Sequence, residues 1–183
     1  MPQREHLILT ATGPDKVGLV QKLSRFISGR GCNIEDSKMA VFCGEFAIIL
    51  LISGDSASLA MISEHHGQIE KESGLSISIK APSAWKPSEF FLPYRLVASC
   101  MDHPGIVYQI SGVLSDMGIN IQSLETETYS APVSGTPLFQ LEAHINVPAR
   151  TNINDVRDRL EELQRSESID IELTPHKRTS DEN

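Results

Sequence analysis

Two similar α+β domains are expected from this sequence, because it contains an internal repeat whose copies share one order of elements. Residues 7–34 align without a gap with residues 94–121 and share ten identities, where average residue usage would give about two. From Leu59 onward the match continues at an offset seven residues larger. We expect the extra residues in Ser130–Thr136, whose composition is typical of a loop. A repeat of this length indicates two copies of one structural unit.

A strand and a helix open the first copy. The apolar run Leu7–Thr12 predicts a strand that ends at Gly13-Pro14. From Val17 onward apolar residues recur at helical spacing. Asp15 has the side chain of a helix N-cap, because its carboxylate can accept from free backbone N–H groups. The helix is expected to end near Gly29.

The rest of the copy predicts two strands, a helix and a last strand. Ile34–Phe42 and Phe46–Ser53 flank a tight turn, and the second is so apolar that we expect it inside the sheet. A helix capped by Asp55 or Ser56 follows, and then the alternating strand Leu75–Lys80. The order βαββαβ defines a ferredoxin-like unit, in which an antiparallel four-stranded sheet carries both helices on one face. The second copy repeats this order.

Prolines and aromatic residues mark the junction between the copies. Proline favours extended, semi-rigid backbone, and Trp85, Phe90 and Phe91 indicate that the junction packs on a domain. We expect a first domain at residues 1–80, a linker at 81–92, a second domain at 93–174 and a polar C-terminal tail at 175–183.

Composition and charge narrow the functional classes. The formal net charge is −8, and an acidic chain repels nucleic-acid phosphates, so direct nucleic-acid binding is not expected. No signal peptide or membrane span is expected, because the longest apolar stretch, Phe46–Ile52, is far below the roughly 20 residues that a bilayer requires. Three cysteines without a pairing framework indicate a reducing, cytoplasmic location.

No catalytic, cofactor or metal motif stands out. The sequence has no recognisable Ser-His-Asp arrangement and no nucleotide-binding glycine loop. His65-His66 lacks a further ligand at a useful spacing on its helix, so a metal site is not expected. Asp155–Glu162 is most simply a solvated helix face. We therefore expect a protein without enzymatic activity or cofactors.

The turn after the first strand of the second copy reads Asp102-His103-Pro104-Gly105 and is followed later by Gly118-Ile119-Asn120-Ile121. This pattern resembles the signature of the ACT domain family of amino-acid-sensing regulatory modules, and the first copy departs from it by placing Val17 where proline is common. The segment Gly31–Ser37 resembles more specifically the glycine cleavage system transcriptional repressors, which are tandem ACT proteins. That resemblance implies contact with a transcription-activator protein rather than with DNA.

The same turn has the chemistry of an amino-acid site. The start of a helix presents free N–H groups that suit a carboxylate, and glycine at positions 18 and 105 permits close backbone approach. The resemblance implies that the aspartates and asparagines, 18 residues apart in each copy, meet the ligand at a domain interface, with aspartate receiving the ammonium group. The candidate ligand-binding residues are Asp15, Lys16, Val17, Gly18, Leu19, Asn33, Asp102, His103, Pro104, Gly105, Ile106 and Asn120.

A structural role for these residues stays open. In that case the aspartates are merely helix caps, the asparagines are turn residues and the glycines allow close packing, and none of them contacts a ligand.

Two functions are therefore compatible with the sequence. One is a regulatory protein that senses a small amino acid, with glycine favoured, and controls a transcription activator. The other is an interaction module without a ligand that regulates a metabolic enzyme. A homodimer is also expected, because such a sheet leaves edge strands and one face to cover.

Overall fold

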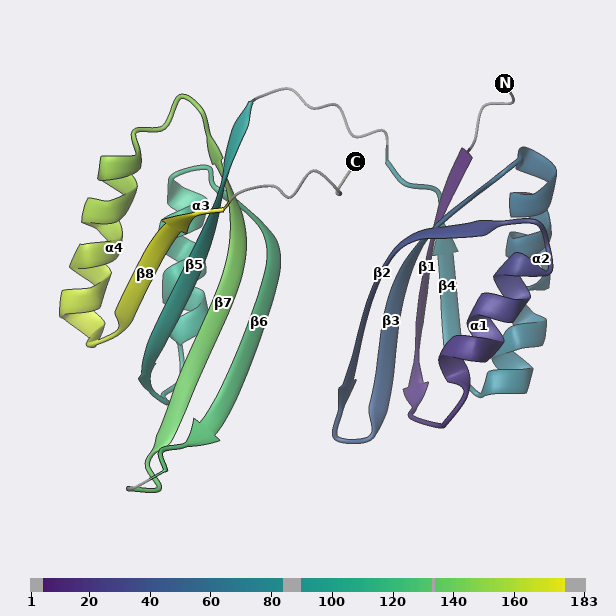
Figure 1. Cartoon of the computed structure of the whole chain (residues 1–183), viewed down its shortest axis with the longest axis horizontal. Coiled ribbons are helices and arrows are strands. Elements are labelled where there is room, and N and C mark those ends of the chain that lie inside the picture. The colour runs from purple at the N-terminus through teal and green to yellow at the C-terminus, as the bar shows by residue number, and fades with distance from the viewer. Residues whose placement is uncertain (1–4, 84–89, 133, 177–183) are drawn as a thin grey trace. The chain divides into compact units, whose positions relative to one another are not determined.

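The computed structural model describes residues 5–83, 90–132 and 134–176, and the chain divides into two compact units, residues 1–86 and 87–183 (Figure 1). In the first unit the elements are β1 (Glu5–Pro14), α1 (Leu19–Ser28), β2 (Asn33–Phe42), β3 (Glu45–Gly54), α2 (Ser56–Ser73) and β4 (Ser76–Lys80). In the second they are β5 (Phe91–Met101), α3 (Ile106–Asp116), β6 (Asn120–Ser130), β7 (Pro137–Pro148), α4 (Ile153–Glu167) and β8 (Asp170–Pro175).

Each unit is one antiparallel sheet with two helices on one face (Figure 1). The strand orders are β2-β3-β1-β4 and β6-β7-β5-β8. The expected α+β fold with two ferredoxin-like units is confirmed, and the apolar strand β3 lies inside its sheet as predicted. In the first unit a hairpin joins the edge strand β2 to the central strand β3, α1 connects β1 to β2, and α2 connects β3 to β4. The second unit has the same connections.

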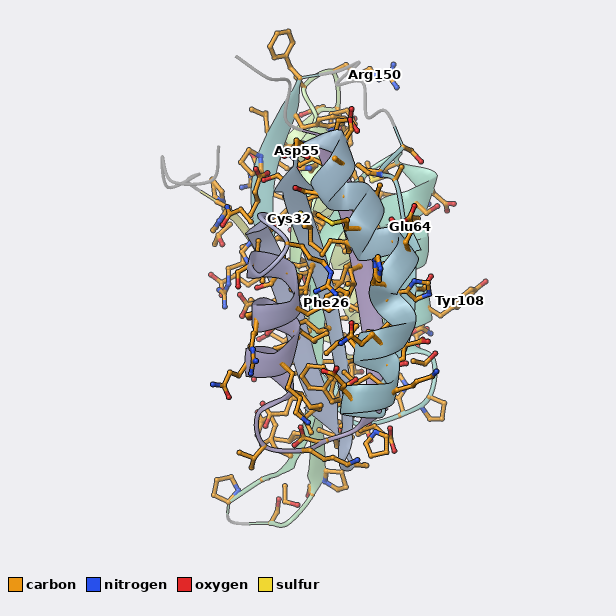
Figure 2. The ribbon with its side chains drawn as sticks, turned by 90° about the vertical axis from the view of Figure 1, so that its right-hand side faces the viewer. Phe26, Cys32, Asp55, Glu64, Tyr108 and Arg150 are labelled. Carbon is orange, nitrogen blue, oxygen red and sulfur yellow. The ribbon has the colours of Figure 1, made fainter. Side chains whose placement is uncertain are left out.

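Each unit has its own hydrophobic core between sheet and helices. Alternate residues of β3, from Phe46 to Ile52, point toward the helices and are at most 7% exposed. They pack with Leu23 of α1 and Ile62 of α2, and Phe26 lies between the same two helices (Figure 2). The second core is a separate cluster built in the same way around β7. Burying one such side chain contributes about 1.5 to 3 kcal/mol, so the cores hold each unit together.

Two hairpins of different length account for most of the difference between the copies. In the first unit Phe42 pairs with Glu45, and Cys43 and Gly44 form a two-residue turn with positive φ at both positions. In the second unit the equivalent pair is Tyr129 and Leu138. Six of the seven extra residues therefore belong to this hairpin, and the seventh precedes α4. The sequence alone predicts all seven in the hairpin loop, so the structure corrects this prediction by one residue.

The junction differs from the expectation in one respect. Phe91 begins β5, but Phe90 is 90% exposed, so its ring does not pack on a domain. Trp85 lies outside the described residues, as does the predicted polar tail from residue 177 onward. Among the described helices none is long and apolar enough to cross a membrane.

Candidate functional site

The two candidate turns are held in place by the same backbone contact. The N–H of Asp15 donates to the carbonyl oxygen of Gly44 at 2.8 Å, and the N–H of Asp102 donates to that of Pro137 at 3.1 Å. Each contact ties the turn after the first strand of a unit to the hairpin between its second and third strands. Because both units conserve this bond, the two turns have the same position on their sheets.

The helix after each turn begins at a glycine in the left-handed conformation. Gly18 has φ 92° and Gly105 has φ 103°, and neither helix receives a hydrogen bond from a capping side chain. Only glycine adopts this backbone without strain, which explains why both copies keep it. The prediction that Asp15 caps α1 is wrong, because the glycine moves the helix start to Leu19. Asp102, by the same arrangement, does not cap α3.

The remaining turn residues divide into exposed and buried groups. Asp15, Lys16 and Val17 are exposed, as are Asp102, Pro104 and Gly105, whereas His103 is half-buried. The imidazole Nδ1 of His103 lies 3.2 Å from the carbonyl oxygen of Pro104. Leu19 and Ile106 are 2% and 3% exposed. The side chains of these last two residues belong to the cores and anchor the turns, so only their backbone can face a ligand.

Lysines near the first turn lie at the C-terminal end of α2. A Cβ atom built on Gly74 would lie 3.5 Å from the Lys16 Nζ, and the Lys22 Nζ donates to the carbonyl oxygen of Glu72 at 3.2 Å. Cations are favourable at a helix C-terminus, where carbonyl groups lack partners. The Lys16 ammonium group therefore lies beside the C-terminal end of α2, a position that the sequence did not indicate.

The asparagines lie at the opposite end of each sheet from the aspartates. Asn33 pairs with Ser53, whereas the Asp15 turn follows Pro14, which pairs with Glu45. Glu45 and Ser53 are eight positions apart along β3, so at about 3.3 Å per residue the turn and the asparagine are about 26 Å apart along the strand. Asn120 and Asp102 have the same arrangement in the second unit. A single unit therefore does not bring its aspartate and asparagine to one ligand.

An open groove of about 640 Å³ runs along α3 and ends at Asn120. It is lined by Tyr108, Ser111, Gly112, Ser115, Gly118, Ile119, Asn120 and Ile121. Tyr108, 81% exposed, projects away from its helix (Figure 2). Our sequence analysis did not identify this groove. The sequence signal for this groove is the set of small residues Ser111, Gly112 and Ser115 on one helix face. The first copy lacks this signal, because Arg25 occupies the position of Gly112.

The second unit contains a thiol and a carboxyl group whose pKa values are shifted by their surroundings. Burial raises the pKa of the Cys100 thiol, and the nearby Asp102 carboxylate adds to the rise, so this thiol stays neutral. On the open face of the second sheet Arg95 donates two hydrogen bonds to Glu142, which lowers the pKa of that carboxyl group. In the described residues no three His, Cys, Asp or Glu side chains are grouped to hold a metal ion. Each turn offers backbone N–H groups and one carboxylate, together with Lys16 in the first turn and His103 in the second.

A repeated ferredoxin-like unit with a glycine-started helix after its first strand is the architecture of a regulatory ACT protein. ACT domain models match residues 5–80 and 94–128, and the chain belongs to the ACT domain family.

Two kinds of relative extend the comparison over the whole chain. The glycine cleavage system transcriptional repressor of Escherichia coli (strain K12) is 24% identical over 163 residues, which cover 89% of this chain and 86% of the relative. A crystal structure of an unknown protein from Galdieria sulphuraria is 28% identical, with a TM-score of 0.80, and covers 96% of this chain and all of its own. A crystal structure of a candidate glycine cleavage system transcriptional repressor shares the fold at 22% identity and a TM-score of 0.69. The similarity therefore includes both units and their order.

Proposed function

We infer that this chain is a non-catalytic regulator that senses a small amino acid, with glycine favoured, and controls a transcription activator through protein–protein contact. The observation that carries the proposal is the similarity to a glycine cleavage repressor across 89% of the chain. The net charge of −8 supports contact with a protein rather than with DNA. The turns support amino-acid binding, because a helix start suits a carboxylate and Asp15 or Asp102 suits an ammonium group.

In this proposal the amino-acid site is shared between two copies of the chain. About 26 Å separates the turn from the asparagine of the same unit, so a ligand that contacts both must draw them from two different units, and the proposal takes these from two copies of the chain. A homodimer supplies such a pair of sites by symmetry. The turn contributes backbone N–H groups and the aspartate, and the asparagine side chain of the other copy donates and accepts the remaining hydrogen bonds.

Glycine binding is expected to be weak. With a ceiling of about 1.5 kcal/mol per non-hydrogen atom, glycine gains no more than roughly 7.5 kcal/mol, which corresponds to a dissociation constant no tighter than a few micromolar. A constant in the micromolar to millimolar range suits a sensor of an abundant metabolite. Isothermal titration calorimetry of the full chain against glycine, serine, alanine and larger amino acids tests this. Heat of binding for one small amino acid is the expected result.

The separation of Asp15 from Asn33 favours one alternative, an ACT module that binds no ligand and regulates a metabolic enzyme. The same titrations distinguish the two functions. If no amino acid produces heat at millimolar concentration while the chain is folded by circular dichroism, the sensing proposal is wrong and the ligand-free module replaces it.

A further inference from the structure

The first helix of the first unit lies in a basic stretch of an otherwise acidic chain. Four of the 16 basic residues fall between residues 16 and 34, and none of the 24 acidic residues does. The rest of the chain therefore has 12 basic and 24 acidic residues, a net charge of −12. The stretch includes the turn after β1 and all of α1. The basic surface of α1 consists of Lys16, Lys22, Arg25 and Arg30.

The second unit lacks this surface. Its equivalent stretch, residues 103–121, contains one acidic residue, Asp116, and neither lysine nor arginine. Both stretches form the turn and the first helix of the same fold, so that fold does not require four cations at these positions. The four equivalent positions hold His103, Gln109, Gly112 and Met117.

The charges of the basic surface are not compensated by carboxylates. Among the described residues none of the four cations forms an ion pair. The Lys16 ammonium group lies beside the C-terminal end of α2, and the Lys22 Nζ donates to the backbone carbonyl oxygen of Glu72. The Arg30 guanidinium group lies 3.8 Å from the centroid of the Phe26 ring and donates to the carbonyl oxygen of that residue at 2.9 Å. These partners are uncharged, so the surface keeps its positive charge.

The basic surface is open to solvent and has exposed apolar neighbours. Its residues are exposed apart from the half-buried Arg30. Lys22 and Arg25 are three positions apart and share a face of α1, which lies beside α2 in the helix layer (Figure 2). Val17 is fully exposed and Val20 is 46% exposed. A partner for this surface therefore needs negative charges together with some apolar side chains.

An acidic protein segment fits this surface better than a nucleic acid does. DNA carries one negative charge per about 1.7 Å of helix axis, so a duplex on α1 also meets the net charge of −12 on the rest of the chain. A short protein segment places a few carboxylates against α1 alone. At about 0.1 M salt the Debye length is about 10 Å, so distant acidic residues repel such a segment little. Its apolar side chains can contact the exposed valines, which phosphate groups cannot.

We propose that the basic surface of α1 docks a partner protein through an acidic segment that also carries apolar side chains. The proposal rests on the part of the proposed function in which the chain contacts a protein, and it does not require that an amino acid binds. Since the contacts are ionic and exposed, they weaken as salt rises. Because the second unit has no such surface, each chain docks one segment.

A synthetic peptide rich in glutamate with a few leucines, labelled with a neutral dye, tests the surface. Fluorescence anisotropy with the full chain at about 0.1 M salt should show binding to the parent that weakens at higher salt. Arg25→Glu places a carboxylate in the basic surface and should weaken binding about fivefold or more. The matched control is Arg157→Glu, which reverses an exposed arginine on α4 and changes the net charge equally. Its binding should stay within about twofold of the parent.

Three results would overturn the proposal. One is a parent that does not bind the peptide at millimolar concentration. Another is equal weakening by Arg25→Glu and Arg157→Glu, which shows an effect of net charge alone. The third is binding of a DNA duplex, but not of the peptide, that Arg25→Glu abolishes, since this assigns the surface to nucleic acid.

Two further measurements separate this proposal from folding and from amino-acid sensing. Circular dichroism verifies that Arg25→Glu is folded. Arg25→Gln removes the charge without adding a carboxylate, so it should weaken peptide binding in the same direction but less. Arg25 is not among the candidate amino-acid ligands, so calorimetry of Arg25→Glu with glycine should match the parent. Failure of the docking surface is thus distinguishable from failure of the sensing function.

Discussion

The two units share a backbone plan but differ in the side chains that support it. Both begin the first helix at a left-handed glycine, both tie the preceding turn to a hairpin, and both have a bulge early in the edge strand. The second helices end differently. In the first unit Lys22 donates to a terminal carbonyl group of α2, whereas Gln109 at the equivalent position has a buried side-chain oxygen without a hydrogen-bond partner. The backbone conformation at these positions is therefore the same in both units, whereas the side chains that surround it differ.

The largest difference that this comparison predicts is between core variants of the two units. Phe46→Ala and Phe139→Ala each remove a core ring, at 2% and 9% exposure, and such losses cost about 3 to 5 kcal/mol. Because the two cores are separate clusters, each variant should destabilise only its own unit. Hydrogen exchange followed by mass spectrometry measures protection in both units at once. Equal loss of protection in both units would show that they unfold together.

The second prediction asks which turn binds the ligand. Asp102→Ala removes the proposed ammonium partner in the copy with the fuller family signature, and should weaken binding by about 1.5 to 3 kcal/mol, or roughly 10- to 150-fold. Since neither aspartate caps its helix, the melting temperature should remain nearly unchanged. Calorimetry of Asp102→Ala and Asp15→Ala in parallel measures both copies. If both variants bind the amino acid as the parent does, the aspartates are not ligand residues.

Much of the fold could be predicted because the repeat supplied each element twice. The residue pattern predicts the three strands that follow the first helix within one residue of their bounds and predicts the cap of the second helix, since tertiary packing reinforces the same pattern. The helix start was misjudged, because Asp15 has cap chemistry and the positive φ of Gly18 is invisible in a residue pattern. The site was harder still. Spacing between Asp15 and Asn33 says nothing of their separation until strand register places them at opposite ends of β3.

The third prediction uses the second helices, which are capped by different chemistry. The Asp55 carboxylate accepts from the N–H of Ser58 at 2.8 Å, and this hydrogen bond lowers the pKa of Asp55. Asn152 caps α4 by accepting from the N–H of Asn154 at 3.1 Å and does not titrate as a carboxylate. Replacing either cap by alanine should lower the melting temperature of its unit by a few degrees.

Only the Asp55 cap should depend on pH. A carboxyl group whose pKa is lower in the folded state stabilises the fold fully above the ordinary aspartate value of about 3.9, and this contribution is lost as pH falls through the folded-state pKa. The difference between parent and Asp55→Ala should therefore shrink below about pH 4, whereas that for Asn152→Ala should not follow the same titration. Thermal melts between pH 3 and pH 7 measure this. Parallel pH profiles for the two variants would contradict the assignment.

The smallest predicted effect is at the C-terminal end of the second helices. Gly74 ends α2 with φ 78°, and Ser168 ends α4 in the same left-handed conformation with φ 57°. A residue with a Cβ is strained there, whereas glycine is not, although glycine has more conformational freedom to lose on folding. Because the strain is the larger of these effects, Ser168→Gly should stabilise the second unit by about 0.5 to 1 kcal/mol. The reciprocal variant Gly74→Ser should destabilise the first unit by a similar amount. Urea unfolding of both variants against the parent measures the two shifts, and a destabilised Ser168→Gly would mean that the serine makes a contact worth more than the strain.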